Sequence, residues 1–134
     1  MTQLISYLNF NGNCREAMTF YKECVDGELE LMVVGDSPMA DKVPEEAKQN
    51  IMHSTLSKDG MVLLMASDMM GSKQANGNAI TLCLNCSSEE EIYLLFSKLS
   101  AGSQVSHPVK REFWGALFGS FTDKFGMNWM LNFG

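Results

Sequence analysis

Apolar and polar residues follow one order along the first half of the chain, and the same order returns 75 positions later. In the first copy, Asn13 precedes an apolar stripe with the i, i+3, i+4, i+7 spacing of an amphipathic helix, and Gly27 ends it. In the second copy, Ser88 and Gly102 take those two places. An acidic residue three positions after each starting residue predicts a capping box. The stripes are Ala17, Phe20, Tyr21 and Cys24, then Ile92, Leu95, Phe96 and Leu99.

Strand-forming segments surround each predicted helix in a matching order. A polar stretch at 36–49 predicts a long loop with a helical turn at 44–48, and 107–113 predicts a second loop. The run Ser57-Lys58-Asp59-Gly60 predicts a hairpin turn, and 67–78 predicts a flexible boundary between the halves. The predicted strands are 4–10, 28–34, 51–56 and 61–66, then 79–85, 103–106, 116–122 and 127–133.

Each half therefore has the order βαβββ. We predict an α+β protein of one domain, with a first module at 1–70 and a second at 76–134. A helix on one face of a mostly antiparallel sheet leaves the other face to be covered. We expect the two modules to form a curved sheet around a cleft, and the cleft to be the ligand site.

Composition and charge exclude several classes of protein. The 134 residues carry a net charge of −6, and the ten basic residues are scattered, so no basic stripe for a nucleic acid exists. The first ten residues lack the features of a signal peptide, and no apolar run approaches the length of a membrane span. We interpret the four cysteines as reduced thiols. Cys83 and Cys86 lie three residues apart in a predicted strand, so their side chains would point to opposite faces of the sheet. These features favour a cytoplasmic protein without membrane or nucleic-acid partners.

Three segments carry a family resemblance that extends from end to end of the chain. The paired βαβββ pattern and these segments resemble the PhnB-like branch of the vicinal oxygen chelate superfamily, which includes glyoxalase I, bleomycin-resistance proteins and extradiol dioxygenases. The resemblance implies the two-module fold described above. The segments are residues 7–17 with Phe20 and Tyr21, residues 65–68, and the closing run from Phe113 to Asn132.

Metal-dependent members of this superfamily take one ligand from the first and the fourth strand of each module. Counting from the helices and from the two hairpin turns, these positions fall on Ser6, Leu64, Thr81 and Met130. Two hydroxyls and two apolar side chains do not hold Ni²⁺, Zn²⁺ or Fe²⁺, which prefer imidazole, carboxylate or thiolate ligands. We therefore predict no metal and no cofactor.

Few residues of the chain can perform acid–base chemistry. His53 lies in a predicted strand beside the expected cleft, and Asp68 follows the next strand, where its carboxylate could orient His53 or meet a cationic ligand. A hydrogen-bonded strand histidine and a turn aspartate are the structural alternatives for these two. Cys14 lies at the first helix turn, where a lowered thiol pKa would favour reactivity, but an inert thiol is the alternative. His107 is expected to be solvated.

The closing segment is rich in aromatic residues. Phe113 and Trp114 follow the second predicted loop and could wall the cleft or stack on a planar ligand, although aromatic runs also form cores. Tyr7 and Asn9 of the first strand join them as candidate ligand-binding residues. The resemblance and the uncovered edges of the modules imply a homodimer with two-fold symmetry.

Two functions remain open from the sequence. One is a small-molecule binding protein of the bleomycin-resistance type that needs no metal. The other is a metal-independent lyase or isomerase that uses His53 with Asp68. Members of this branch have often carried the label of demethylubiquinone methyltransferase, but the chain lacks the glycine-rich strand-to-helix loop of a conventional methyl-donor site.

Overall fold

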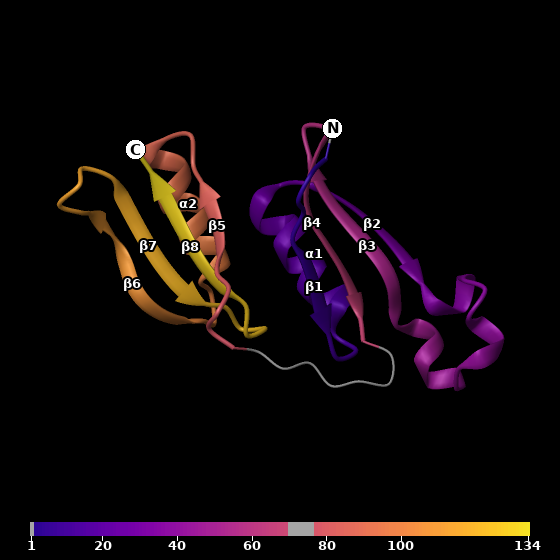
Figure 1. Cartoon of the computed structure of the whole chain (residues 1–134). Helices are drawn as coiled ribbons and strands as arrows, with labels where there is room; N and C mark the ends of the chain where they lie inside the picture. The colour runs from indigo at the N-terminus through magenta and orange to yellow at the C-terminus, as the bar shows by residue number, and fades with distance from the viewer. Residues whose placement is uncertain (1, 70–76) are drawn as a thin grey trace. The chain divides into compact units, whose positions relative to one another are not determined.

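Each half of the chain carries one four-stranded sheet and one α-helix in a computed structural model, which describes residues 2–69 and 77–134 (Figure 1). The first unit is Met1–Ala75 and the second is Asn76–Gly134. The first unit contains β1 (Tyr7–Phe10), α1 (Cys14–Val25), β2 (Glu28–Val33), β3 (Ile51–Lys58) and β4 (Met61–Asp68). The second contains β5 (Leu82–Asn85), α2 (Glu89–Leu99), β6 (Gln104–Arg111), β7 (Leu117–Thr122) and β8 (Asn128–Phe133).

The two sheets have the same topology. The strand order is β1-β4-β3-β2 in the first and β5-β8-β7-β6 in the second. In each sheet the strand before the helix pairs in parallel with the last strand, and the other pairs are antiparallel. The predicted α+β class with two βαβββ modules is therefore confirmed. Three short 3-10 helices, η1 (Val34–Asp36), η2 (Ala40–Lys42) and η3 (Glu45–Gln49), occupy the predicted long loop.

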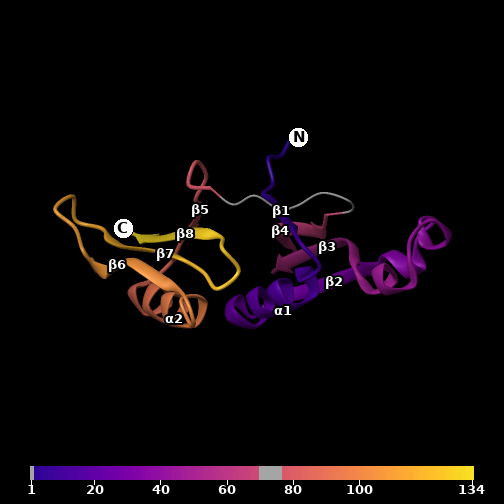
Figure 2. The same ribbon diagram turned by 90° about the horizontal axis from the view of Figure 1, so that it is seen from below.

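Each helix packs on one face of its own sheet, as Figure 2 shows from below. The alternation of side chains along a strand sends every second residue to that face. In the first unit the buried core thus combines the α1 stripe with alternate residues of the strands. We call the opposite face of this sheet the first open face. Tyr7, His53, Thr55 and Met65 lie near its centre, and none of them is fully buried.

The starts of the two helices differ, although the sequence predicts a capping box at both. Ser88 caps α2, because its Oγ accepts a hydrogen bond from the backbone N–H of Glu91 at 3.0 Å. The Glu91 carboxylate in turn accepts from the N–H of Ser87, one residue earlier than a standard capping box requires. The Asn13 side chain makes no capping hydrogen bond to α1, so the prediction is wrong there.

The end of α1 also departs from its prediction. Asp26, and not Gly27, adopts the left-handed conformation, with φ of 56°. Gly27 has a different task, because a Cβ atom there would lie only 2.6 Å from the carbonyl oxygen of Ser57. The glycine is needed for the close approach of the chain to β3.

The hairpin between β3 and β4 follows its prediction. Asp59 and Gly60 both have positive φ, 52° and 79°, as a two-residue type I′ turn requires. The strands around it extend further than the sequence indicates, to Lys58 and to Asp68.

Three other strands differ from their predicted bounds by more than one residue. β1 and β5 begin only at Tyr7 and Leu82, three residues later than predicted. β6 continues to Arg111, through His107 and Pro108, where a loop was predicted. β6 is an edge strand with register shifts on both sides of His107, and such a strand tolerates a proline that donates no hydrogen bond.

The boundary predicted at 67–78 lies mostly outside the described residues, which end at Met69 and resume at Gly77. In the described part of the chain, no helix is long and apolar enough to cross a membrane.

Candidate ligand-binding site

A polar chain crosses the first open face. The Tyr7 hydroxyl and Nδ1 of His53 form a hydrogen bond of 3.2 Å, and Nε2 of His53 pairs with Oγ1 of Thr55 at 3.3 Å. Tyr7 lies on β1 and His53 on β3, so the tyrosine side chain reaches across β4, which separates these strands. The two rings lie 5.8 Å apart with an angle of 32° between their planes.

This arrangement suits a histidine that exchanges protons or hydrogen bonds. A neutral imidazole donates from one nitrogen and accepts at the other, and a hydroxyl can do either. Tyr7 and Thr55 can therefore support both tautomers of His53. Tyr7 is 45% exposed, so a ligand on this face can reach the hydroxyl.

Asn9 extends the same face. It lies two residues after Tyr7 on β1, opposite Ser67 of β4, and its side chain is exposed. The structure thus brings three of the predicted site residues, Tyr7, Asn9 and His53, to one sheet face.

Asp68 lies on the other face of this sheet. Its side chain is 4% exposed, and its two carboxylate oxygens accept three backbone hydrogen bonds. Oδ1 accepts from Gly12 at 2.8 Å and Cys14 at 3.0 Å, and Oδ2 accepts from Ile51 at 2.8 Å. The structure does not bring Asp68 to His53, because alternation places the two side chains on opposite faces.

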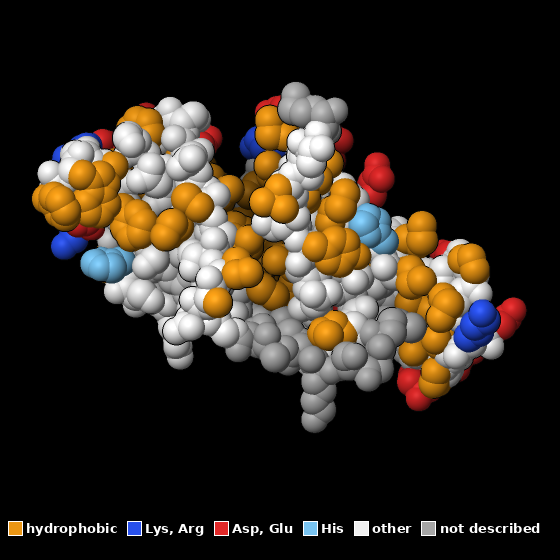
Figure 3. All heavy atoms as spheres, in the orientation of Figure 1, with side chains coloured by type: hydrophobic (Ala, Val, Ile, Leu, Met, Phe, Trp, Pro, Cys, Tyr) orange, Lys and Arg blue, Asp and Glu red, His pale blue; other side chains and the backbone are white. Residues whose placement is uncertain are grey.

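The predicted aromatic pair lies in the second unit, at the turn between β6 and β7. Phe113 is 96% exposed and Trp114 56% exposed, and their rings meet edge to face at 4.9 Å. Phe118 lies 6.1 Å from Trp114, and His107 lies 6.2 Å from Phe118. We call these four rings, His107, Phe118, Trp114 and Phe113, the aromatic ladder. Figure 3 shows apolar side chains gathered at the tip of this hairpin.

The ladder continues onto the face of the second sheet opposite α2, which we call the second open face. Pairing of the strands places Phe118 beside Asn132, and Ser120 beside Met130. Asn85 of β5 lies next to Asn132 on the same face, with 3.5 Å between their amide groups. The centre of this face is therefore uncharged and combines apolar with amide and hydroxyl groups.

The four positions inferred for a superfamily metal site do not form a donor set. Leu64 is 6% exposed and packs on the α1 side of its sheet, whereas its neighbour Met65 lies on the first open face. The count along β4 therefore reached the wrong face. Met130 lies on the second open face, but a thioether is a poor ligand for Zn²⁺ or Ni²⁺. Among the described residues, no three His, Cys, Asp or Glu side chains lie close enough to hold a metal ion.

Cys14 is an inert thiol in this structure. Burial raises its pKa from 9.0 to about 12, outweighing the hydrogen bond with Ser54 that favours the thiolate. Cys83 is exposed and Cys86 is buried. Burial also raises the pKa of Cys86, to about 11.

Two residues of these surfaces escaped the sequence analysis. Thr55 lies two positions after His53, and on a strand that spacing places both on one face, so the signal was present. Phe118 lies in the aromatic closing segment, and only the pairing of β6 with β7 reveals its place between His107 and Trp114.

The fold agrees with comparisons to known proteins. The chain belongs to the family described as 3-demethylubiquinone-9 3-methyltransferase, whose sequence profile matches residues 2–132. It is 31% identical to Protein YjdN of Escherichia coli strain K12 over 141 aligned positions, which span 96% of this chain and 93% of the relative.

Two solved structures are also similar over nearly the whole chain. Protein PA1353 from Pseudomonas aeruginosa is 39% identical, with a TM-score of 0.87, and the match covers 99% of this chain and 98% of that protein. The putative 3-demethylubiquinone-9 3-methyltransferase PhnB protein from Bacillus cereus is 25% identical, with a TM-score of 0.77 and coverage of 99% and 100%. Glyoxalase-related structures at 10%, 16% and 19% identity share the fold alone, with TM-scores of 0.61, 0.58 and 0.60. The expected PhnB-like relationship is confirmed.

Proposed function

We propose that this protein binds a planar, largely apolar small molecule without the help of a metal ion. The observation that carries the proposal is the aromatic ladder, two of whose rings, Phe113 and Trp114, are exposed. Neighbouring aromatic rings that are exposed offer a large surface for stacking, and in the free protein this apolar surface is in contact with water. Covering that surface with a planar ligand removes apolar area from water and so favours binding.

The open faces support the same class of ligand. Amide and hydroxyl groups on these faces, such as those of Asn85, Asn132 and Tyr7, can orient a ligand by hydrogen bonds. Binding sites for small molecules commonly combine an apolar lining with a few polar groups of this kind.

The proposal does not involve the metal that related superfamily members use. The donor chemistry of Ser6, Leu64, Thr81 and Met130 does not fit such an ion, and Leu64 also faces α1. Elemental analysis of the purified, dialysed protein is expected to find no stoichiometric transition metal. Retention of one zinc or nickel ion per chain would contradict this part of the proposal.

The family description names a methyl transfer, which we do not propose for this chain. Conventional methyl-donor sites lie at a glycine-rich turn between a strand and a helix in a parallel sheet. Among the strands of the described residues, only the β1–β4 and β5–β8 pairs are parallel, and the segment that joins β1 to α1 is Asn11-Gly12-Asn13. A single glycine at that turn supports no such site.

A metal-independent lyase or isomerase is the second candidate, and the Tyr7–His53–Thr55 chain favours it. A histidine held by two hydroxyl partners is a suitable general acid or base. Asp68 has no part in this candidate, because its oxygens cap α1 from the other face.

A thermal-shift screen of planar heteroaromatic and quinone-like compounds tests the proposal. A ligand that binds only the folded protein raises the melting temperature by mass action. We expect hits in wild-type protein whose shift is reduced in Trp114→Ala. Hits that shift both proteins equally would contradict a role for the aromatic ladder.

A further inference from the structure

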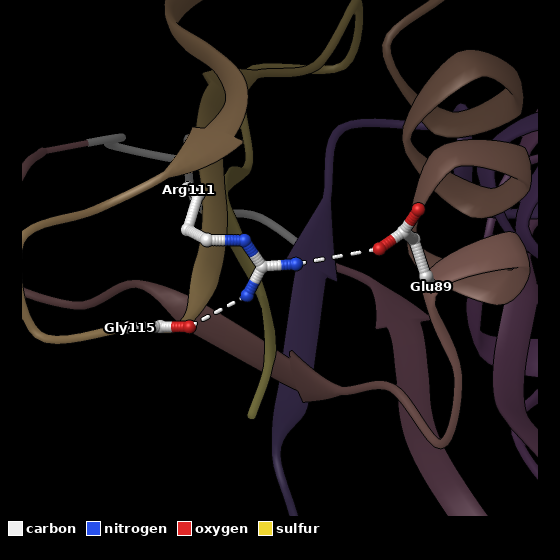
Figure 4. A network of polar contacts seen from close by, with 3 residues as sticks. All are labelled: Glu89, Arg111 and Gly115. Atoms are coloured by element: carbon white, nitrogen blue, oxygen red, sulfur yellow. Dashed lines mark hydrogen bonds and ion pairs between the residues drawn. The ribbon is translucent and has the colours of Figure 1, made fainter.

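The aromatic tip of the second unit is held by one arginine. Phe113 and Trp114 lie within the short turn between Glu112 and Gly115, and this turn closes when the N–H of Gly115 donates to the carbonyl of Glu112 at 2.9 Å. Arg111 ends β6 immediately before the turn. Its Nη1 donates to the carbonyl oxygen of Gly115 at 2.7 Å, and its Nη2 lies 3.3 Å from Oε1 of Glu89 (Figure 4).

The direction of the Arg111 side chain follows from strand pairing. Arg111 pairs with Leu117, which faces α2, whereas the neighbouring Lys110 pairs with Phe118 of the second open face. Arg111 therefore reaches the first turn of α2, where Glu89 lies. The planar guanidinium holds two acceptors at once, one on the turn and one on the helix, which an ammonium group does not do with the same fixed geometry.

This contact is suited to fixing an orientation rather than to stabilising the fold. The Arg111 and Glu89 side chains are 57% and 62% exposed, and ion pairs in such surroundings contribute little to the free energy of unfolding. Yet the turn they join to α2 carries two large rings, which are themselves mostly exposed. Without the clamp, only the turn's own hydrogen bonds and the ring contacts of the ladder would define where these rings point.

We propose that Arg111 is a positioning residue for ligand binding, which ties the Glu112–Gly115 turn to α2 so that the Phe113 and Trp114 rings form a preorganised stacking surface. This inference rests on the proposed function. A wall fixed before binding loses less conformational entropy when the ligand arrives, so the clamp raises affinity without touching the ligand.

Three variants test the clamp in the full-length chain. Arg111→Ala removes both contacts. Arg111→Lys keeps the positive charge but not the forked guanidinium group, and Glu89→Gln removes the negative charge at this position of α2. Glu90→Gln is the matched control, because it makes the same change one residue further along α2. Acrylamide quenching of tryptophan emission reports on the tip, since Trp129 is only 4% exposed and Trp114 is 56% exposed. Affinity is measured with Nile red, an uncharged planar dye.

We expect Arg111→Ala and Arg111→Lys to raise the quenching constant, by less than twofold because the ring is already 56% exposed, at an unchanged melting temperature. Nile red should bind to Arg111→Ala about two- to fivefold more weakly than to wild type, which is the range that an exposed ion pair can supply. The loss of affinity in Glu89→Gln should be smaller. Glu90→Gln should match wild type in both measurements. If Arg111→Lys retains the wild-type quenching constant and the wild-type affinity for Nile red, a positive charge alone is sufficient. That result would contradict the requirement for the forked guanidinium group.

Different experimental results would contradict this inference and the proposed function. If Arg111→Ala leaves both quenching and dye affinity at wild-type values while Trp114→Ala loses affinity, Arg111 is not a positioning residue and the binding surface stands. If Trp114→Ala binds Nile red as wild type does, the aromatic ladder is not the binding surface, and the inference falls with it even where quenching changes.

Discussion

The carboxylate of Asp68 accepts a hydrogen bond from the backbone N–H of Cys14 at 3.0 Å, although 54 residues separate the two. A helix start needs acceptors for its first N–H groups, and α1 obtains one from the end of β4 instead of from its own N-cap side chain. Because Asp68 also accepts from Gly12 and Ile51, one side chain ties together β4, α1 and the beginning of β3.

Asp68→Asn should destabilise the first unit. An amide in this place offers one acceptor oxygen and turns an N–H group toward a backbone donor, so at least one buried group loses its partner. The expected loss is about 1–3 kcal/mol in the free energy of unfolding, measured by urea denaturation. The matched control is Asp59→Asn in the type I′ turn, which asparagine accommodates, with a change within about 0.5 kcal/mol. Equal stability of the two variants would contradict the capping role.

The two helix starts should respond differently to alanine. Ser88→Ala removes an observed cap and should cost about 0.5–2 kcal/mol of stability. Asn13→Ala removes a side chain that does not cap α1, so the loss should be smaller, within about 0.5 kcal/mol. Thermal unfolding followed by circular dichroism compares the variants. A larger loss for Asn13→Ala would show that its side chain does cap the helix in solution.

Buried thiols should make the protein less stable in alkali. The pKa of Cys14 is raised to about 12 in the folded chain, above the ordinary 9.0, so the unfolded chain releases this proton first. The contribution of Cys14 is complete below pH 9.0 and is lost as the pH rises toward 12. Cys14→Ala should therefore show a flatter decline of unfolding free energy above pH 9.0 than wild type, whereas Cys83→Ala, at an exposed thiol, should not. Parallel declines in all three proteins would contradict the burial effect.

Local patterns in the sequence predicted the fold well. The helix stripes and the Asp59–Gly60 turn depend on residues close together in the chain, and both are confirmed. The Asp68 cap depends on a partner more than fifty positions away, so no local pattern could reveal it. The extension of β6 through Pro108 likewise depends on its place at the sheet edge, which only the pairing of strands defines.

The count from the two turns to the inferred metal positions failed because the pairing of β3 with β4 contains a bulge. Leu64 and Met130 lie equally far beyond Gly60 and Gly126, yet they reach different faces. Ser57 pairs with Val62 but Leu56 pairs with Leu64, so β4 carries one extra residue, Leu63, between them, whereas β7 and β8 pair without a register shift. One extra residue reverses which face a strand position occupies.

Some residues of the candidate site were predictable from the sequence, but their contacts were not. Histidine in a strand and aromatic residues after a loop are visible in the sequence, and His53 and Trp114 were identified in this way. The Tyr7 partner of His53 lies two strands away in the sheet order, and the Arg111 clamp joins a turn to a helix. Such contacts follow from the assembled sheet and not from spacing along the chain.

The central proposal is that the aromatic ladder binds a ligand, and acid–base chemistry at His53 is the alternative that the same experiment tests. The most direct test is calorimetric titration of a compound found by thermal shift into wild type, Trp114→Ala, His53→Ala and Tyr93→Ala, with an assay for product. Tyr93 is the control, because its ring is 48% exposed on α2 and lies outside the ladder.

Trp114→Ala should lose about 1–3 kcal/mol of binding free energy, the usual range for an aromatic residue that contributes strongly to binding. His53→Ala should lose less, Tyr93→Ala nothing, and no product should form in any of the four. Product that forms with wild type and falls about a hundredfold or more in rate with His53→Ala, at similar affinity, would contradict the account and establish the acid–base enzyme instead.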